Sequence, residues 1–358
     1  MKIKHLLTAS IAAFCSFIVF PAHTHAAPPT YTVTGLDDLG GSDIWGGAIN
    51  ASGQVSGVSR PAGKPITLYA VRWTGTAPTK LEAPAGTQSV GYGINDSGQV
   101  AGVFYPAGMP DLRAGMSFYH AMRWTGTTPT ELGPGFAYAI NVSGQVAGTN
   151  GAHAVRWTGT TAEELGTLGG TANEGLAINA SGQVAGTSMI AGDSHALHAT
   201  RWTGTKPTDL GTLGGTISKG VGINASGQVV GSAQLTGDSI EHAVRWTGTT
   251  ATDLGTLGGK NSYGFAINAS GDVLGASEIP DAKTKYGTPV IHAFLYTGGK
   301  MYDLNGLLVP GSGVTDLNIV GPQGLNVGNC INDRGQIVAC GTIDGKTHVF
   351  RLDPAAKP

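Results

Sequence analysis

The sequence predicts an all-β fold, a seven-bladed β-propeller of four-stranded blades, and three observations support this prediction. One short motif, Ile-Asn followed by two residues and Gly, recurs seven times along the chain. Each copy belongs to a repeat of about 45 residues with four strand-like segments, which is the usual size of one propeller blade. The segments at the two ends of the chain are complementary, so together they complete the last blade.

The repeat unit contains four predicted strands, which we call a to d. Strand a ends at Ile-Asn, a tight Asn-Ala-Ser-Gly turn follows, and strand b begins with Gly-Gln-Val. Strand c carries His-Ala-x-Arg-Trp, and strand d carries Thr-Asp-Leu-Gly before a glycine-rich loop. Alternating and β-branched residues predict strands, and glycine or asparagine at each break predicts turns. The motif asparagines are Asn50, Asn95, Asn141, Asn179, Asn224, Asn268 and Asn332.

The two ends of the chain predict how the ring closes. Residues 31–40 match strand d with no strand a, b or c before them, and residues 348–351 match strand c with no strand d after them. We therefore expect the N-terminal strand to close the last blade, which leaves no open edge in the ring. Strand a is then innermost. A solenoid is the rival architecture, but it needs polar caps at its ends.

The first 26 residues have the composition of a secretory signal peptide. Lys2 and Lys4 give a positive start, residues 6–20 are apolar, and the segment ends on the small residue Ala26. A membrane anchor is the competing interpretation, but the apolar run is short for a bilayer span of about 20 residues. We expect cleavage after Ala26 and export to the periplasm or the cell exterior. Residues 27–358 then form one seven-repeat domain.

Charge excludes some classes of partner. The formal net charge is −2, and no run of like charges occurs. A nucleic-acid partner needs a concentrated basic surface, and a polybasic membrane contact needs the same. We therefore expect no nucleic-acid partner. We also expect a monomer, and no membrane span after the signal peptide is removed, because no later segment could cross a bilayer.

The repeated units resemble the HAF-repeat family of extracellular bacterial proteins. The similar segments are Gly-Thr-Leu-Gly-Gly, Ile-Asn-Ala-Ser-Gly-Gln-Val and His-Ala-Phe-Leu (residues 292–295), and the resemblance covers residues 31–353. The first repeat departs from it with Tyr69-Ala70 in place of His-Ala. The resemblance implies export and a repeat fold, and it implies no assigned reaction. The tryptophans also look like those of WD-repeat propellers, but the Trp-Asp pair is missing.

No catalytic, metal or cofactor site is predicted. A histidine recurs on strand c, but one histidine per repeat spreads the ligands around a ring, whereas a zinc site needs several ligands at about 2.1 Å. We expect each histidine to bond a neighbouring loop, and the strand-c tryptophans to form the core between blades. Six Asn-x-Ser triplets match a glycosylation acceptor, but turn chemistry explains them. The histidines are His120, His153, His198, His242, His292 and His348, and the tryptophans are Trp73, Trp124, Trp157, Trp202 and Trp246.

The mature chain keeps two cysteines, Cys330 and Cys340, which an oxidising compartment could join. Both lie in the last repeat, on strands a and b, and share one face of the sheet. Simple hairpin register places Cys330 opposite Val338, so the cysteines are diagonal neighbours at a marginal separation for a disulfide. The sequence leaves both states open.

One position on strand a predicts a ligand-binding rim. If strand a is innermost, these side chains ring the channel entrance, beside the variable b-to-c and d-to-a loops where function is often located. Aromatic, acidic and basic side chains together favour sugars or other flat ligands, although they could simply fill the channel. The residues are Trp45, Val90, Phe136, Glu174, Lys219, Tyr263 and Val327. His195, in a longer b-to-c loop, joins these candidates.

Two functions remain open at this point. The first is a binding propeller that contacts a glycan, a peptide or a surface partner. The second is an extracellular polysaccharide hydrolase or lyase, which rests on fold analogy. An enzyme should gather polar groups with perturbed pKa values at one mouth, and Glu174, Lys219 and His195 are the residues to inspect.

Overall fold

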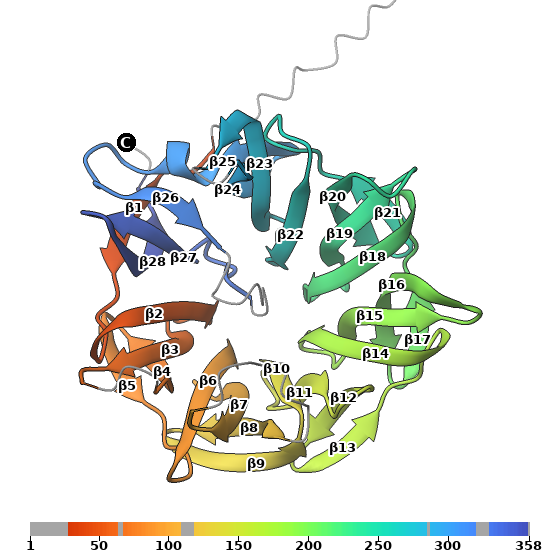
Figure 1. The fold of residues 1–358 in the computed structure, drawn as a ribbon, viewed down its shortest axis with the longest axis horizontal. Coiled ribbons are helices and arrows are strands. Elements are labelled where there is room, and N and C mark those ends of the chain that lie inside the picture. The colour runs from red at the N-terminus through yellow and green to blue at the C-terminus, as the bar shows by residue number, and fades with distance from the viewer. Residues whose placement is uncertain (1–27, 64–66, 109–117, 285–286, 320–328, 357–358) are drawn as a thin grey trace, which may run out of the picture.

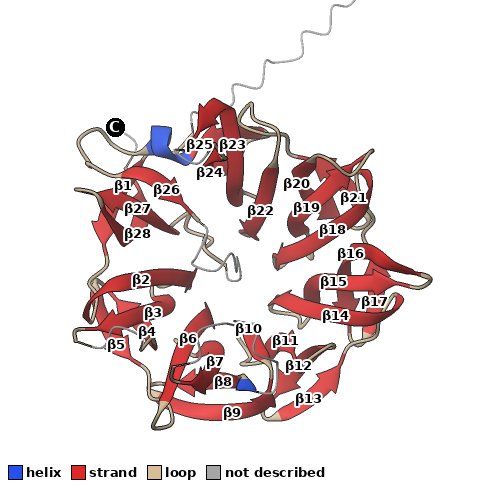
Figure 2. Ribbon diagram, in the orientation of Figure 1, coloured by secondary structure: helices blue, strands red, loops and turns tan. Residues whose placement is uncertain are grey.

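Strands arranged around a central channel make up the protein (Figure 1). The computed structural model describes residues 28–356 apart from 64–66, 109–117, 285–286 and 320–328. The predicted signal peptide and Val327 therefore lie outside the described residues. Within the described part, the helical structure is the 3₁₀ turn η2 (Leu304–Leu307) and a short 3₁₀ segment at Phe118, and the rest is strand or loop (Figure 2). No described helix is both long enough and apolar enough to cross a membrane.

Most sheets are antiparallel and contain four strands in sequence order. The first contains β2 (Gly40–Ile49), β3 (Val55–Pro61), β4 (Tyr69–Thr74) and β5 (Ala77–Lys80). The second contains β6 (Thr87–Ile94), β7 (Val100–Pro106), β8 (His120–Thr125) and β9 (Thr128–Pro134). The third contains β10 (Phe136–Ile140), β11 (Val146–Thr149), β12 (Ala154–Thr158) and β13 (Thr161–Glu164). Another contains β22 (Ser262–Ile267), β23 (Val273–Lys283), β24 (Pro289–Thr297) and β25 (Lys300–Asp303).

One sheet has eight strands and spans two sequence repeats. One half contains β14 (Gly169–Ile178), β15 (Val184–Ile190), β16 (Asp193–Thr203) and β17 (Lys206–Asp209). The other half contains β18 (Gly214–Ile223), β19 (Val229–Leu235), β20 (Glu241–Thr247) and β21 (Thr250–Asp253). A single parallel pair, Leu197 with Ile217, joins β16 to β18. The two halves otherwise repeat the four-strand pattern.

The last sheet contains both ends of the described chain. Its order is β1 (Tyr31–Gly35), β28 (Lys346–Pro354), β27 (Ile337–Ile343) and β26 (Thr315–Asn318). The predicted pairing of the N-terminal strand with the C-terminal strand is confirmed, because β1 and β28 pair from Tyr31–Pro354 to Gly35–Phe350.

Strand a of the last repeat differs from the prediction. We expected one continuous strand ending at Ile331-Asn332. Instead, β27 pairs with β26 at Cys340 and Thr342, and near its start it makes only an isolated bridge from Ile337 to Ile331. The insertion after Asp303 is the reason. It supplies a separate strand, β26, far upstream of the motif. The insertion therefore completes the sheet with part of its own length.

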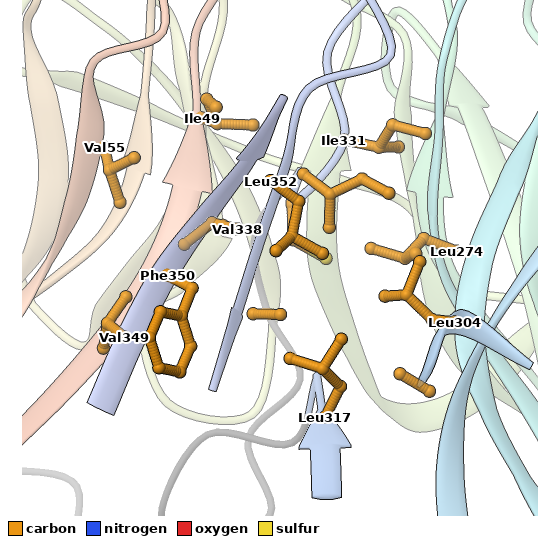
Figure 3. Packing of buried hydrophobic residues seen from close by; sticks show 14 of the residues in the cluster. Ile49, Val55, Leu274, Leu304, Leu317, Ile331, Val338, Val349, Phe350 and Leu352 are labelled. Atoms are coloured by element: carbon orange, nitrogen blue, oxygen red, sulfur yellow. The ribbon is translucent and has the colours of Figure 1, made fainter. Parts of the chain in front are cut away.

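A large apolar cluster fills the junction on both sides of the last sheet. It joins Ile49 and Val55 of the first sheet, Val349 and Phe350 of β28, and Leu274 of β23 (Figure 3). Leu304 and Leu317 from the insertion extend it. The apolar packing therefore spans the place where the chain ends meet, which stabilises closure by burial as well as by strand pairing.

Four strand-c histidines pair with acids of strand d rather than with loops, namely His120, His198, His242 and His292. His198 Nδ1 lies 2.9 Å from Asp209 Oδ1, and His242 Nδ1 lies 2.9 Å from Asp253. The expected bond to a neighbouring loop is therefore wrong for these repeats. The reason is the pairing of strands c and d, which brings the carboxylate eleven residues later beside the imidazole.

Both cysteines are free thiols. The Val338 N–H donates to the Cys330 carbonyl at 3.0 Å, as the predicted opposition of these residues requires. Burial raises the pKa of Cys330 to about 12 and that of Cys340 to about 11. Thiolates are the reactive form, so both groups are protonated and shielded at neutral pH.

We expect native protein at pH 8 to resist alkylation by iodoacetamide at both cysteines, and unfolded protein to react at both. Mass spectrometry of the two samples measures this. Because the folded pKa values exceed the unfolded value near 9, the unfolded state loses these protons first and stability should fall as pH rises above about 9. Rapid labelling of the native protein would contradict the prediction, and a mass lower by two hydrogens would reveal a disulfide.

Candidate functional site

The predicted rim residues occupy equivalent positions on the innermost strands. Each lies opposite a residue of strand b. The next residue pair along the two strands is Gly–Gly, or Ala137–Gly148 in the third sheet. The pairs are Trp45–Val58, Val90–Val103, Phe136–Thr149, Glu174–Thr187, Lys219–Ser232 and Tyr263–Ala276. Figure 1 shows β2, β6, β10, β14, β18 and β22 around the channel. The sequence alignment of the repeats is therefore also a spatial alignment.

Phe136 belongs to a stacked aromatic cluster rather than to an open surface. Its ring centroid lies 4.8 Å from that of Tyr119 and 5.6 Å from that of Tyr138. Tyr105 and Tyr92 extend the row at 5.3 Å and 5.7 Å. All five rings are buried. For Phe136, packing within the channel wall is thus the better description of the side chain.

Sequence reasoning missed this cluster. Tyr92 and Tyr138 lie two residues after the rim positions Val90 and Phe136, so an extended strand turns them toward the same side. That spacing was a usable signal. The contribution of Tyr105 and Tyr119 from strands b and c is not visible in a single repeat, because it depends on the packing of neighbouring sheets.

Glu174 and Lys219 are the exposed charges of the rim. Although Glu174 is exposed as a whole residue, the channel wall partly desolvates its carboxyl group and raises its pKa, while the charge of Lys219 opposes this shift. Burial also raises the pKa of Tyr138, and the charge of Glu174 adds to that effect. These groups of three successive repeats therefore interact electrostatically at one mouth of the channel.

Trp45 and Tyr263 are half-buried at the same level. Burial raises the pKa of the Tyr263 hydroxyl, and the charges of Glu241 and Glu278 add to the shift. Each ring thus keeps part of its surface available to a ligand. His195 belongs to β16, but its side chain lies outside the described residues, and so does Val327.

The side chains of the rim suit ligand binding better than catalysis. It combines one acid, one base and two half-exposed rings, which suits hydrogen bonding and stacking with a polar, flat-faced ligand. Among the described residues, no three His, Cys, Asp or Glu side chains are grouped so as to hold a metal ion.

The opposite end of the channel holds a circular system of hydrogen bonds. Each motif asparagine is buried, and most donate from Nδ2 to the carbonyl of the motif asparagine in the next repeat. Examples are Asn95 to Asn141 at 2.9 Å and Asn332 to Asn50 at 2.8 Å. We call this ring the asparagine belt. The turn explanation of the motif was therefore incomplete. The remaining links are Asn50 to Asn95, Asn141 to Asn179, Asn179 to Asn224 and Asn224 to Asn268.

The belt surrounds a cavity of about 210 Å³. Isoleucines that precede the motif asparagines form its walls, and Leu176, Val221 and Phe265 lie deeper in the channel. The residues that follow the asparagines form its rim. The channel therefore has two different mouths, one with variable side chains and one built from repeated turns.

Comparison with known proteins establishes the fold. No known protein-family profile matches the chain, and neither does any curated protein. Among solved structures, the β-propeller domain of the Trilobed protease from Pyrococcus furiosus is similar with a TM-score of 0.55 and 8% identity, over 88% of this chain and 94% of that chain.

Two further structures are more distant. A gluconolactonase from Xanthomonas campestris gives a TM-score of 0.41 at 12% identity, over 92% of this chain and 99% of that chain. TolB from Acinetobacter baumannii gives 0.42 at 11% identity, over 92% of this chain and 81% of that chain. Sequence identities this low give no information about the function of this chain. The strand arrangement and the first similarity together establish that this chain is an all-β protein with a β-propeller fold.

Proposed function

We propose that this protein is an exported, monomeric, seven-bladed HAF-repeat propeller that binds a glycan or a surface partner at the variable mouth of its channel. The count of seven treats the eight-stranded sheet as two blades, because only one residue pair joins its halves. The positive and apolar start of the chain supports export. The repeated motifs support the family.

One observation carries the binding proposal. Positions of identical register on successive innermost strands carry chemically different side chains, although the surrounding repeat hardly changes. Packing alone would favour similar side chains at equivalent positions. A rim with an exposed acid, an exposed base and two half-exposed rings instead provides several different contacts to one ligand around a common axis. Glu174, Lys219, Trp45 and Tyr263 are the residues that we assign to it.

A glycan array tests the proposal directly. We expect mature wild-type protein to bind one class of glycan, and the double variant Trp45→Ala, Tyr263→Ala to bind at least tenfold more weakly, since stacking on aromatic rings supplies much of the affinity for sugars. Tyr302→Ala, on the outermost strand β25, is the matched control and should bind normally.

Two outcomes would redirect the proposal. Equal binding by the double variant would remove the rim from the ligand site. Absence of glycan binding by the wild type would count against a carbohydrate ligand and leave a protein partner, to be sought among surface proteins with the same variants. Conversion of a bound glycan to shorter or unsaturated products, lost in Glu174→Gln, would favour the hydrolase or lyase alternative.

A further inference from the structure

At the end of the channel that holds the asparagine belt, two backbone amides are bound by carboxylates of the protein itself. The Ala51 N–H donates to Asp96 Oδ1 at 2.9 Å, and the Ala269 N–H donates to Asp333 Oδ1 at 2.7 Å. In both cases the amide follows a motif asparagine, and the carboxylate comes from the same position in the next repeat. A carboxylate is therefore a natural acceptor for the amide at this position.

In three consecutive repeats the same amide has no carboxylate at this position, either on its own turn or on the next turn. The turns share their backbone bonds, because the asparagine N–H bonds the carbonyl four residues later and the glycine N–H bonds the asparagine carbonyl. The amides of Val142, Ala180 and Ala225 are therefore oriented like those of Ala51 and Ala269. The next repeats supply alanine instead of aspartate. Within the described part of the chain, no acceptor bonds these three amides.

Positive charge lies behind the same three turns. The Nη1 atoms of strand-c arginines donate to the glycine carbonyl of each turn, from Arg123 to Gly144 at 3.1 Å and from Arg201 to Gly227 at 2.9 Å. Arg156 makes the equivalent bond to the middle turn. Arg156 also pairs with Glu163, whereas Arg123 and Arg201 have no ion pair among the described residues. Asp96 and Asp333 lie in other repeats.

Apolar surface completes the site. Ile140, Ile178 and Ile223 line the cavity directly inside the three turns, and Phe265 lies deeper. An apolar cavity with a few convergent polar groups is the usual form of a small-molecule site. Val142, Ala180 and Ala225 line the same cavity as this apolar wall, so the three turns and the isoleucines border one space.

We propose that these three turns form a binding site for a small organic carboxylate whose apolar part fills the isoleucine-lined cavity. The carboxylate takes the position that Asp96 and Asp333 take beside the Ala51 and Ala269 amides of the preceding repeats, and the guanidinium groups favour its charge. This site lies at the opposite end of the innermost strands from the variable rim, so it does not depend on the function proposed there.

Amide NMR of the mature protein with butyrate as the probe tests the site. We expect saturable shifts at the Val142, Ala180 and Ala225 amides with butyrate, and much smaller ones with n-butanol, which has the same chain length but no charge. The double variant Ala180→Asp, Ala225→Asp places the protein's own carboxylates on the Val142 and Ala180 amides. It should weaken butyrate binding at least tenfold.

Two controls keep the test decisive. Thr249→Asp adds a charge on an exposed turn of strands c and d at this end and should leave binding within about twofold. Asp96→Ala frees the Ala51 amide, which should then shift with butyrate. Unsaturable shifts, equal shifts with butanol, or full binding by the double variant would each overturn the proposal.

Discussion

Replacement of Trp202 with alanine should lower the free energy of unfolding by about 3–5 kcal/mol. The indole is fully buried, with an exposed fraction of 0%, in the cluster that joins Ala147 and Leu165 of one repeat to Val184 of the next. Its Nε1 donates to the Gly166 carbonyl of the preceding repeat at 2.6 Å. Truncation therefore opens a cavity between two sheets and leaves a carbonyl without its donor. Urea unfolding followed by far-ultraviolet circular dichroism measures the loss.

The chain offers a matched pair that separates packing from hydrogen bonding. Trp246 occupies the same position and is equally buried, but its Nε1 has no hydrogen-bond partner among the described residues. Trp202→Phe removes a bond, whereas Trp246→Phe removes an unsatisfied donor. We expect Trp202→Phe to cost about 1 kcal/mol more than Trp246→Phe. Equal losses would show that the indole bond contributes nothing, and a loss below about 1 kcal/mol in Trp202→Ala would show that this contact is not core.

The repeated parts of the fold could be predicted from the sequence because each repeat contains the residue pattern that predicts its own strands and turns. Strand c shows the pattern His-Ala-x-Arg-Trp at one spacing in several copies, and its tryptophans are buried between sheets as expected. Pairing of residues 31–35 with the C-terminal strand followed from complementary ends. In each case the information lies within one repeat or in the comparison of two.

Features formed between repeats could not be predicted in the same way. The row of stacked rings through Tyr119 and Phe136 combines residues of different sheets, so it depends on the angle at which those sheets pack. The separate strand Thr315–Asn318 has no motif, and its pairing with β27 arises from an insertion of irregular length. The candidate rim was found because its residues share one position in the repeat.

The asparagine belt is the clearest case of a role between repeats, and it makes the second large prediction. Asn141 Nδ2 donates to Gln145 Oε1 at 3.0 Å and to the Asn179 carbonyl at 3.1 Å, while its Oδ1 accepts from the Gln145 N–H at 3.0 Å. The side chain is buried. Asn141→Ala leaves these partners without compensation, so we expect a loss of about 2–4 kcal/mol in urea unfolding.

Asn268 distinguishes the belt from the turn. It makes the equivalent bonds within its own turn, to Asp272, but among the described residues its amide does not reach the carbonyl of Asn332. Asn268→Ala therefore removes only turn bonds, and it should cost about 1 kcal/mol less than Asn141→Ala. If both variants lose the same stability, the motif acts through the turn alone. If Asn141→Ala costs more, the asparagines also hold neighbouring repeats together. The recurrence of Ile-Asn in every repeat would then follow from closure of the ring, because Asn332 bonds Asn50 across the ends of the chain.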